Sequence, residues 1–213
     1  MLRAVIFDLG GVVLGSPLHA IAAYERELGL PANAVNRVVA ATAPHGAWSR
    51  LERGELSMEA FYTAFEADCA AAGHRLSARE MMARMSAAAR PRPSMLRAIG
   101  TIREAGLLTA ALTNNWAHAE PGSAVVDDGT RALREHFDVF VESSVEGLRK
   151  PDPRIYSLAC DRLGIEPPEA AFLDDIGANL KPARELGMHT IRVTEPEQAL
   201  RELEAVIGLT LLG

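Results

Sequence analysis

Short apolar runs alternate with helix-like segments through most of the chain, and this alternation limits the possible folds more than any other feature. The runs cover residues 4–7, 107–112, 139–141, 170–173 and 190–193, and each is followed by small or polar residues. Runs this short and apolar are typical of strands that are buried on both faces of a parallel sheet. The sequence therefore predicts such a sheet, with 139–141 as its weakest strand.

Helical patterns occupy the intervals between these runs. They cover residues 94–105, 154–163, 180–186 and 196–207. Gly106, Gly164 and Gly187 stand where glycines commonly end helices. Because strand and helix alternate, we expect an α/β fold, a Rossmann-like doubly wound parallel sheet with right-handed crossovers. In sheets of this kind, ligands bind beyond the carboxyl ends of the strands.

Residues 16–90 break the alternation. They are rich in Ala, Glu, Arg and Met, contain no convincing strand, and predict helices at 18–28, 58–72 and 78–89. We therefore expect residues 1–15 and 91–213 to form the α/β core, with residues 16–90 as a helical cap inserted after the first strand.

The composition and charge of the chain exclude some classes of binding partner. A net charge of -6 argues against a nucleic-acid partner, whereas a small phosphorylated substrate needs only a local cluster of positive charge. No apolar run approaches the roughly 20 residues that cross a bilayer, no secretory signal opens the chain, and Cys69 and Cys160 resemble reduced thiols. We expect a soluble cytoplasmic protein without a membrane partner. The oligomeric state stays open, with a homodimer as one option.

Asp8 ends the first predicted strand and is followed by Gly10 and Gly11. Glycines after a buried strand allow a tight turn and let the backbone approach a ligand. A carboxylate at this place can attack phosphorus or carbon. By itself, the segment also fits an ordinary structural turn with an exposed aspartate.

Polar residues follow the next strand and precede a later helix. Thr113, Asn114 and Asn115 end the second run, and their hydroxyl, amides and backbone N–H groups can hold phosphate oxygens. Lys150 precedes a proline, which holds it extended, so that its ammonium can offset the charge of a carboxylate and a phosphoryl group. Residues 117–129 are predicted to form a loop near this site.

Asp174 and Asp175 end the fourth run as adjacent carboxylates. Two such groups repel each other at the end of a buried strand unless a cation lies between them. An N-cap role explains one of the pair but not both. Oxygen ligands beside a phosphate favour Mg²⁺, so we expect a magnesium site here.

Together these segments resemble the haloacid-dehalogenase superfamily, whose motifs are a nucleophilic Asp, a Thr or Ser, a Lys and an acidic metal-binding pair. The resemblance covers nearly the whole chain. It is nearest to the N-terminal phosphatase domain of soluble epoxide hydrolases and to the similar N-terminal domain of acyl-CoA dehydrogenase fusion proteins. The residues that carry it are those of 113–116, 150–156 and 172–183.

This resemblance implies a Mg²⁺-dependent phosphohydrolase that acts through an aspartyl-phosphate on Asp8, with the cap closing over the site. The implied catalytic residues are Asp8, Thr113, Asn114 and Lys150. The implied metal ligands are Asp8, the Gly10 carbonyl, Asp175 and, as an additional or supporting group, Asp174, with Asn179 orienting the acidic loop. Gly10, Gly11, Asn115 and, as a clamp from the cap, Arg50 are candidates for substrate binding.

One position departs from the family pattern. Phosphatases of this superfamily usually carry a second Asp two residues after the nucleophile, as general acid and base, and Gly10 stands there instead. Three interpretations follow: leaving groups that need no proton, such as acyl or anomeric phosphates; a proton donor from elsewhere, such as the cap; or a weakly catalytic domain that binds a phosphorylated ligand. Metal-independent dehalogenation of a 2-haloacid is a further alternative.

Overall fold

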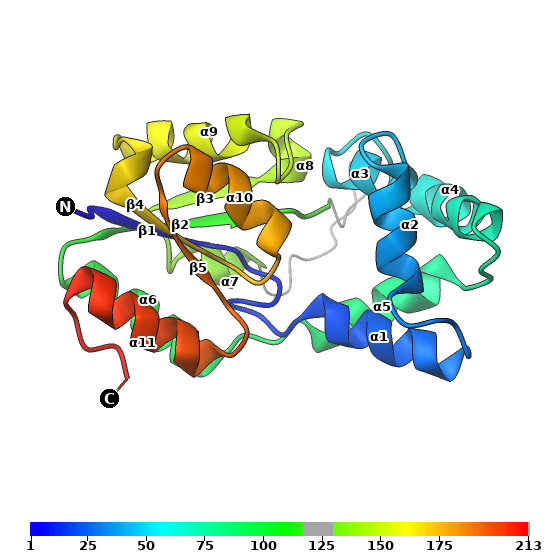
Figure 1. Ribbon diagram of the computed structural model, residues 1–213, viewed down its shortest axis with the longest axis horizontal. Helices are drawn as coiled ribbons and strands as arrows, with labels where there is room; N and C mark the ends of the chain where they lie inside the picture. Colours follow the sequence, from blue (N-terminus) through cyan, green and yellow to red (C-terminus); the bar gives the residue numbers. More distant parts are fainter. Residues whose placement is uncertain (117–129, 213) are drawn as a thin grey trace.

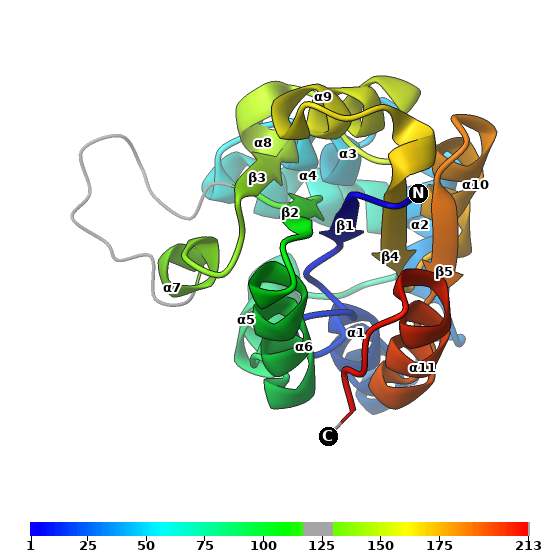
Figure 2. The same cartoon turned by 90° about the vertical axis from the view of Figure 1, so that its left-hand side faces the viewer.

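The structure is a computed structural model that describes residues 1–116 and 130–212, so the loop predicted at 117–129 lies outside it. Five parallel strands form one sheet in the order β3-β2-β1-β4-β5, which Figure 2 shows edge to edge. The strands are β1 (Ala4–Phe7), β2 (Leu108–Thr113), β3 (Val139–Glu142), β4 (Ala170–Asp174) and β5 (His189–Arg192). The predicted α/β class with a parallel sheet is confirmed.

Helices cover both faces of this sheet. The helices α6 (Pro93–Glu104) and α11 (Pro196–Ile207) pack with Val5 and Phe7 of β1 in one hydrophobic cluster. The other face holds α9 (Pro153–Leu163) and α10 (Gly177–Glu185), which pack with Ala4 and Ile6. Successive strand residues point to opposite faces, so an uninterrupted apolar run is what two covered faces require. Figure 2 shows α9 above the sheet and α6 and α11 below it.

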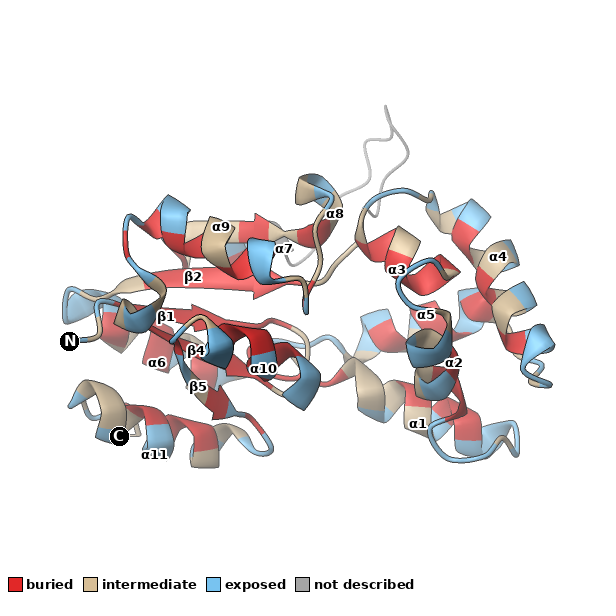
Figure 3. Cartoon of the chain, turned by 45° about the horizontal axis from the view of Figure 1, so that its top comes forward, coloured by how far each residue is buried: buried red, intermediate tan, exposed pale blue. Residues whose placement is uncertain are grey.

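Five helices between β1 and α6 form a second body, which we call the helical module. They are α1 (Pro17–Glu27), α2 (Ala34–Thr42), α3 (Ala47–Glu52), α4 (Met58–Ala71) and α5 (Ala78–Ala88). Their buried faces meet in a hydrophobic cluster of their own, which includes Phe61, Phe65 and Met81. Figure 1 shows the module beside the sheet, and Figure 3 shows that its helices are buried on the faces turned toward one another.

Two backbone segments join the module to the core, and they run next to each other. Gly15 N donates to Arg90 O at 2.9 Å, and Arg92 N donates to Val13 O at 2.8 Å. The remaining short helices are α7 (Thr130–Arg134), α8 (Ser143–Glu146) and the 3₁₀ turn η1 (Pro167–Glu169). Among the helices described, none is both long and apolar enough to cross a membrane.

Candidate active site at the carboxyl ends of the strands

Asp8 and Asp174 lie side by side because of the register of β1 and β4. Phe7 is paired with Leu173, and Asp8 N continues the ladder by donating to Leu173 O at 2.9 Å. The chain places β2 and β3 on one side of β1, and β4 and β5 on the other. The two aspartates therefore lie where the strand order reverses, which is the usual place for a ligand in such sheets.

Lys150 joins these two carboxylates. Its Nζ lies 2.8 Å from Asp8 Oδ1 and 2.8 Å from Asp174 Oδ2, and the residue is 1% exposed. Burial alone would lower the pKa of the Lys150 ammonium, but Asp174 and Asp8 outweigh it and raise that pKa above its usual value. Lys150 is therefore charged, and it fixes the carboxylate of Asp8 in place.

The Asp174 side chain is fully occupied by supporting contacts. Besides Lys150, it accepts hydrogen bonds from Ile176 N at 2.8 Å and from Asn179 Nδ2 at 3.1 and 3.2 Å. The backbone carbonyl of Asn179 in turn accepts a hydrogen bond from the Tyr156 hydroxyl at 2.7 Å. Asn179 thus orients the acidic loop through Asp174, and Asp174 supports Lys150 more directly than it offers a free oxygen to a metal.

Asp175 is in the opposite situation. Its Oδ1 is buried and has no hydrogen-bond partner among the described residues. A Cβ at Gly11, where φ is +87°, would lie 2.1 Å from Asp175 Oδ2, so the backbone of the glycine turn approaches this carboxylate closely. Burial and the neighbouring Asp174 raise the pKa of Asp175 to about 6. A carboxylate with an unpartnered buried oxygen is suited to a cation.

Oxygens of Asp8, Asp174 and Asp175 all lie within 4.8 Å of one another. Burial is the largest cause that raises the pKa of Asp8, and the neighbouring Asp174 and Asp175 raise it further. Lys150 lowers it, and the net effect is a pKa of about 7. Lys150 compensates only part of this charge. These three residues therefore fit a divalent cation with oxygen ligands. Asp8 and Asp175 offer it more available oxygens than Asp174 does.

The residues at the end of β2 have supporting contacts that the sequence did not indicate. The Asn114 side chain accepts from Lys150 N at 2.8 Å and donates to Lys150 O at 3.0 Å, so it holds the lysine backbone. The Asn115 amide donates to Glu142 at 2.8 Å, and its oxygen accepts from the Ser144 hydroxyl at 2.9 Å. The hydrogen bonds described for these two side chains thus go to protein groups, and the role of Asn114 and Asn115 in holding a phosphoryl group stays a prediction.

Three further predicted residues differ in their placement. Thr113 is 5% exposed at the end of β2, next to Asn114. Gly10 lies between Asp8 and α1, where a Cβ would be in ordinary contact with Pro17 at 3.4 Å. Arg50 is not brought into the carboxylate cluster, because it lies on α3 with 44% of its side chain exposed and faces Glu55 at 3.6 Å.

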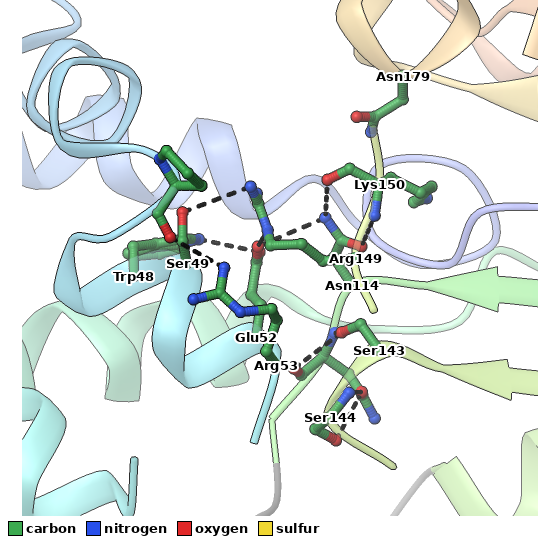
Figure 4. A network of polar contacts seen from close by, with 12 residues as sticks. Trp48, Ser49, Glu52, Arg53, Asn114, Ser143, Ser144, Arg149, Lys150 and Asn179 are labelled. Carbon is green, nitrogen blue, oxygen red and sulfur yellow. Dashed lines mark hydrogen bonds and ion pairs between the residues drawn. The ribbon is translucent and has the colours of Figure 1, made fainter. Parts of the chain in front are cut away.

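The residues that link the module to the site were missed by sequence reasoning. Figure 4 shows Glu52 of α3 between Trp48, Arg149 and Asn114. Glu52 is 6% exposed and pairs with Arg149, the residue that precedes Lys150. The one available signal was a pair of adjacent cations, Arg149 and Lys150, ahead of a helix.

Several known proteins resemble this chain in sequence. Acyl-CoA dehydrogenase family member 10 from Mus musculus is 40% identical over 212 residues, which are 98% of this chain and 19% of that protein. Bifunctional epoxide hydrolase 2 from Sus scrofa is 38% identical over 229 residues, which cover 99% of this chain and 40% of that protein. The chain thus spans less than half the length of either relative.

Further matches include both metal-bound and dehalogenating proteins. A HAD family enzyme from Bacteroides thetaiotaomicron, solved with magnesium and inorganic phosphate, superposes with a TM-score of 0.61 at 20% identity over 90% of this chain and 94% of that one. (S)-2-haloacid dehalogenase 1 from a Pseudomonas strain is 31% identical over 101 residues, 47% of this chain and 43% of that protein. The family model for haloacid dehalogenase-like hydrolases matches residues 2–187, and the chain belongs to that family of hydrolases.

Proposed function

We propose that this hydrolase is a Mg²⁺-dependent phosphatase that acts on a small phosphorylated substrate through an aspartyl-phosphate on Asp8. The observation that carries the proposal is the unequal treatment of three clustered carboxylates. Lys150 and Asn179 fix Asp174, Lys150 holds one oxygen of Asp8, and Asp175 keeps a buried oxygen without a described partner. The three roles thus fall to different residues: Asp8 is the nucleophile, Lys150 is the cation that compensates its charge, and Asp175 is a metal ligand.

The chemistry follows from these contacts. Lys150 holds Oδ1 of Asp8, and the other oxygen attacks phosphorus while the bond to the leaving oxygen breaks and its electron pair departs with that oxygen. Water then cleaves the acyl phosphate, which releases phosphate and restores the carboxylate. Mg²⁺ held by Asp8 and Asp175 would neutralise the charge that gathers between the carboxylates and the phosphoryl oxygens.

The leaving group is the part of this reaction that Gly10 restricts. Nothing at Gly10 can protonate a departing oxygen, and the buried carboxylate that the module brings near the site, Glu52, is already paired with Arg149 and Trp48. We therefore extend the proposal to substrates whose leaving groups are weak bases, namely acyl or anomeric phosphates. General acid catalysis is worth about 10²- to 10⁴-fold, and these substrates lose least without it.

Dehalogenation stays the second candidate because a 2-haloacid dehalogenase is among the relatives. An aspartate that displaces halide from carbon needs no metal, and Lys150 already compensates Asp8 in part. Asp175, however, would be left without a cation, so the cluster favours phosphoryl transfer.

One experiment separates these functions. Hydrolysis of p-nitrophenyl phosphate and of acetyl phosphate is measured with Mg²⁺, with EDTA, and with the Asp8→Asn variant, beside chloride release from 2-chloropropionate. We expect phosphate release that requires both Mg²⁺ and Asp8. Equal rates for wild type and Asp8→Asn would remove the catalytic proposal and leave a phosphate-binding domain, whereas EDTA-resistant chloride release would favour the dehalogenase.

A further inference from the structure

Two adjacent cations, Arg149 and Lys150, point to different parts of the molecule. Lys150 reaches into the core to Asp8 and Asp174. Arg149 reaches outward to the helical module, where its Nε pairs with Glu52 and its Nη1 donates to the Ser49 hydroxyl at 3.4 Å. Because these side chains leave from neighbouring Cα atoms, a displacement of Arg149 is passed directly to the backbone of Lys150.

Glu52 is held from three sides. Its Oε1 accepts from Trp48 Nε1 at 2.9 Å, and its Oε2 is shared between Arg149 and Asn114 Nδ2, the latter at 3.4 Å. Its side chain is 8% exposed and that of Arg149 is 18% exposed. A largely buried charge pair with this many hydrogen bonds is held in one geometry more firmly than an exposed pair that solvent screens.

Asn114 connects this pair to Lys150 a second time. An amide group has two N–H hydrogens, and here one faces Lys150 O at 3.0 Å while the other faces Glu52. Its oxygen accepts from Lys150 N. Glu52 therefore contacts two groups that fix the backbone of Lys150. One is Arg149, the residue before it, and the other is the side-chain amide of Asn114. Figure 4 shows this arrangement.

The backbones of module and core also meet closely beside these residues. Gly54, at the end of α3, has φ +71°, and a Cβ there would lie 2.3 Å from Ser144 O of α8. The ring centroids of Trp48 and Trp116 are 6.3 Å apart at an interplanar angle of 73°. We call the set Trp48, Ser49, Glu52, Asn114 and Arg149 the module junction. It is the place where α3 of the module touches the core loop that carries Lys150.

We propose that Glu52 is a positioning residue of the reaction, which fixes Lys150 against Asp8 through Arg149 and Asn114 when the module is seated on the core. The inference rests on the phosphatase function proposed above. It assigns to the module a role in assembling the catalytic lysine, in addition to covering the substrate. A module displaced from the core would leave Arg149 without its carboxylate and loosen the loop that holds Lys150.

The test is a double-mutant cycle with Glu52→Gln and Arg149→Met in the full chain, assayed with p-nitrophenyl phosphate and Mg²⁺. We expect each single variant to lower kcat at least about tenfold, part of the roughly 10²-fold that a displacement of 1 Å can cost, with KM within about twofold of wild type. Because both act on one link, the double variant should lose no more than the worse single variant. Glu52→Asp and Arg149→Lys, which keep the charges, should recover part of kcat.

A control pair and an optical readout separate positioning from simple destabilisation. Glu59→Gln breaks an exposed module pair with Arg79, whose side chains are 65% and 62% exposed, and should leave kcat unchanged. The chain has two tryptophans, and both lie at the contact, so the emission spectrum should change in Glu52→Gln and not in Glu59→Gln.

The outcomes are distinct. Unchanged kcat in folded Glu52→Gln and Arg149→Met, or losses that multiply in the double variant, refute the positioning role. A fall in kcat that is fully accounted for by the unfolded fraction, measured by circular dichroism at the assay temperature, refutes it as well. If wild type itself releases no phosphate, the proposed function fails first.

Discussion

Replacement of Lys150 by methionine should destabilise the metal-free protein by an amount that grows with pH. Lys150 is buried, and its ammonium contacts Asp8 and Asp174 at 2.8 Å each. Removing one partner of a buried ion pair costs about 3–5 kcal/mol, because the remaining charge is uncompensated. We expect the variant to relieve that charge by binding a proton at Asp8, whose pKa is already raised by burial.

The sign of the pH effect follows from the pKa of Asp8, which is raised from 3.8 in a free side chain to about 7. A carboxyl group with a higher pKa in the folded state contributes stability that is lost as pH rises from the unfolded to the folded pKa. In wild type this loss is largely complete above pH 7, since the folded pKa is about 7. Without Lys150, which lowers that pKa, the loss should continue to higher pH.

Each additional proton bound by the folded state gives a slope of about 1.4 kcal/mol per pH unit. Between pH 7 and pH 9, the gap in unfolding free energy between wild type and Lys150→Met should therefore widen by up to about 2.7 kcal/mol. For a chain of this length, 1 kcal/mol moves Tm by about 2–4 °C, so the gap in Tm should widen by about 5–11 °C.

The measurement is thermal unfolding in EDTA at pH 7, 8 and 9. Lys181→Met is the matched control, because Lys181 is 78% exposed and lies 3.9 Å from Glu185. Its Tm should follow that of wild type at every pH. Parallel Tm curves for wild type and Lys150→Met would refute the reasoning, because they would show that Lys150 does not lower the pKa of Asp8.

Three further outcomes follow from the same site. Mg²⁺ at about 100 times its Kd should add about 2.7 kcal/mol of stability to wild type, and Asp175→Asn should abolish that shift in Tm. Gly10→Asp, whose Cβ has room beside Pro17, should raise hydrolysis of alkyl phosphates by about 10²-fold or more and change acetyl phosphate hydrolysis little, as rates of phosphate release will show. Gly11→Ala should suppress phosphatase activity through collision with Asp175, whereas Gly73→Ala, at a similar φ of +81° with open space around it, should cost some stability and no activity.

The sheet was predictable because each strand carries its own signal. An apolar run such as 170–173 predicts a buried strand even when the neighbouring strands are unknown. The structure has β4 at Ala170–Asp174, with all five residues buried. The meeting of Asp8 with Asp174 and Asp175 also followed, since the carboxyl ends of parallel strands share one edge. These inferences need only local pattern and topology. Lys150 precedes α9 and does not end a strand, so its place beside these carboxylates was expected from the family resemblance.

Contacts between the module and the core were not predictable in this way. The helix α3 has six residues, too few to show a helical period, and α2 begins after Asn33 in a left-handed conformation. Arg50 was a candidate clamp because it is a cation on an otherwise apolar and acidic module, yet it faces Glu55 with 44% of its side chain exposed. The cation that does bind the module comes from the core, and its partner lies 97 residues away in sequence.

Two pairs of adjacent charged residues in this chain have different roles at the candidate site, because the backbone directs their side chains to different partners. In each pair, one residue belongs to the candidate active site directly, and the other supports it or contacts the module. The pairs are Lys150 with Arg149, and Asp175 with Asp174. Near the end of a strand or in an extended segment, successive side chains leave the backbone in different directions. The two members of a pair therefore meet different partners, even where one oxygen of each lies within 4.8 Å of the other, as for Asp174 and Asp175. The pairs thus locate a site, and their hydrogen bonds assign the roles: Asp174 is saturated by Lys150, Ile176 and Asn179, whereas Asp175 keeps an unpartnered oxygen among the residues described. If Asp174→Asn retained Mg²⁺ binding while losing turnover, and Asp175→Asn lost both, this division would be established by measurement; the reverse result would overturn it.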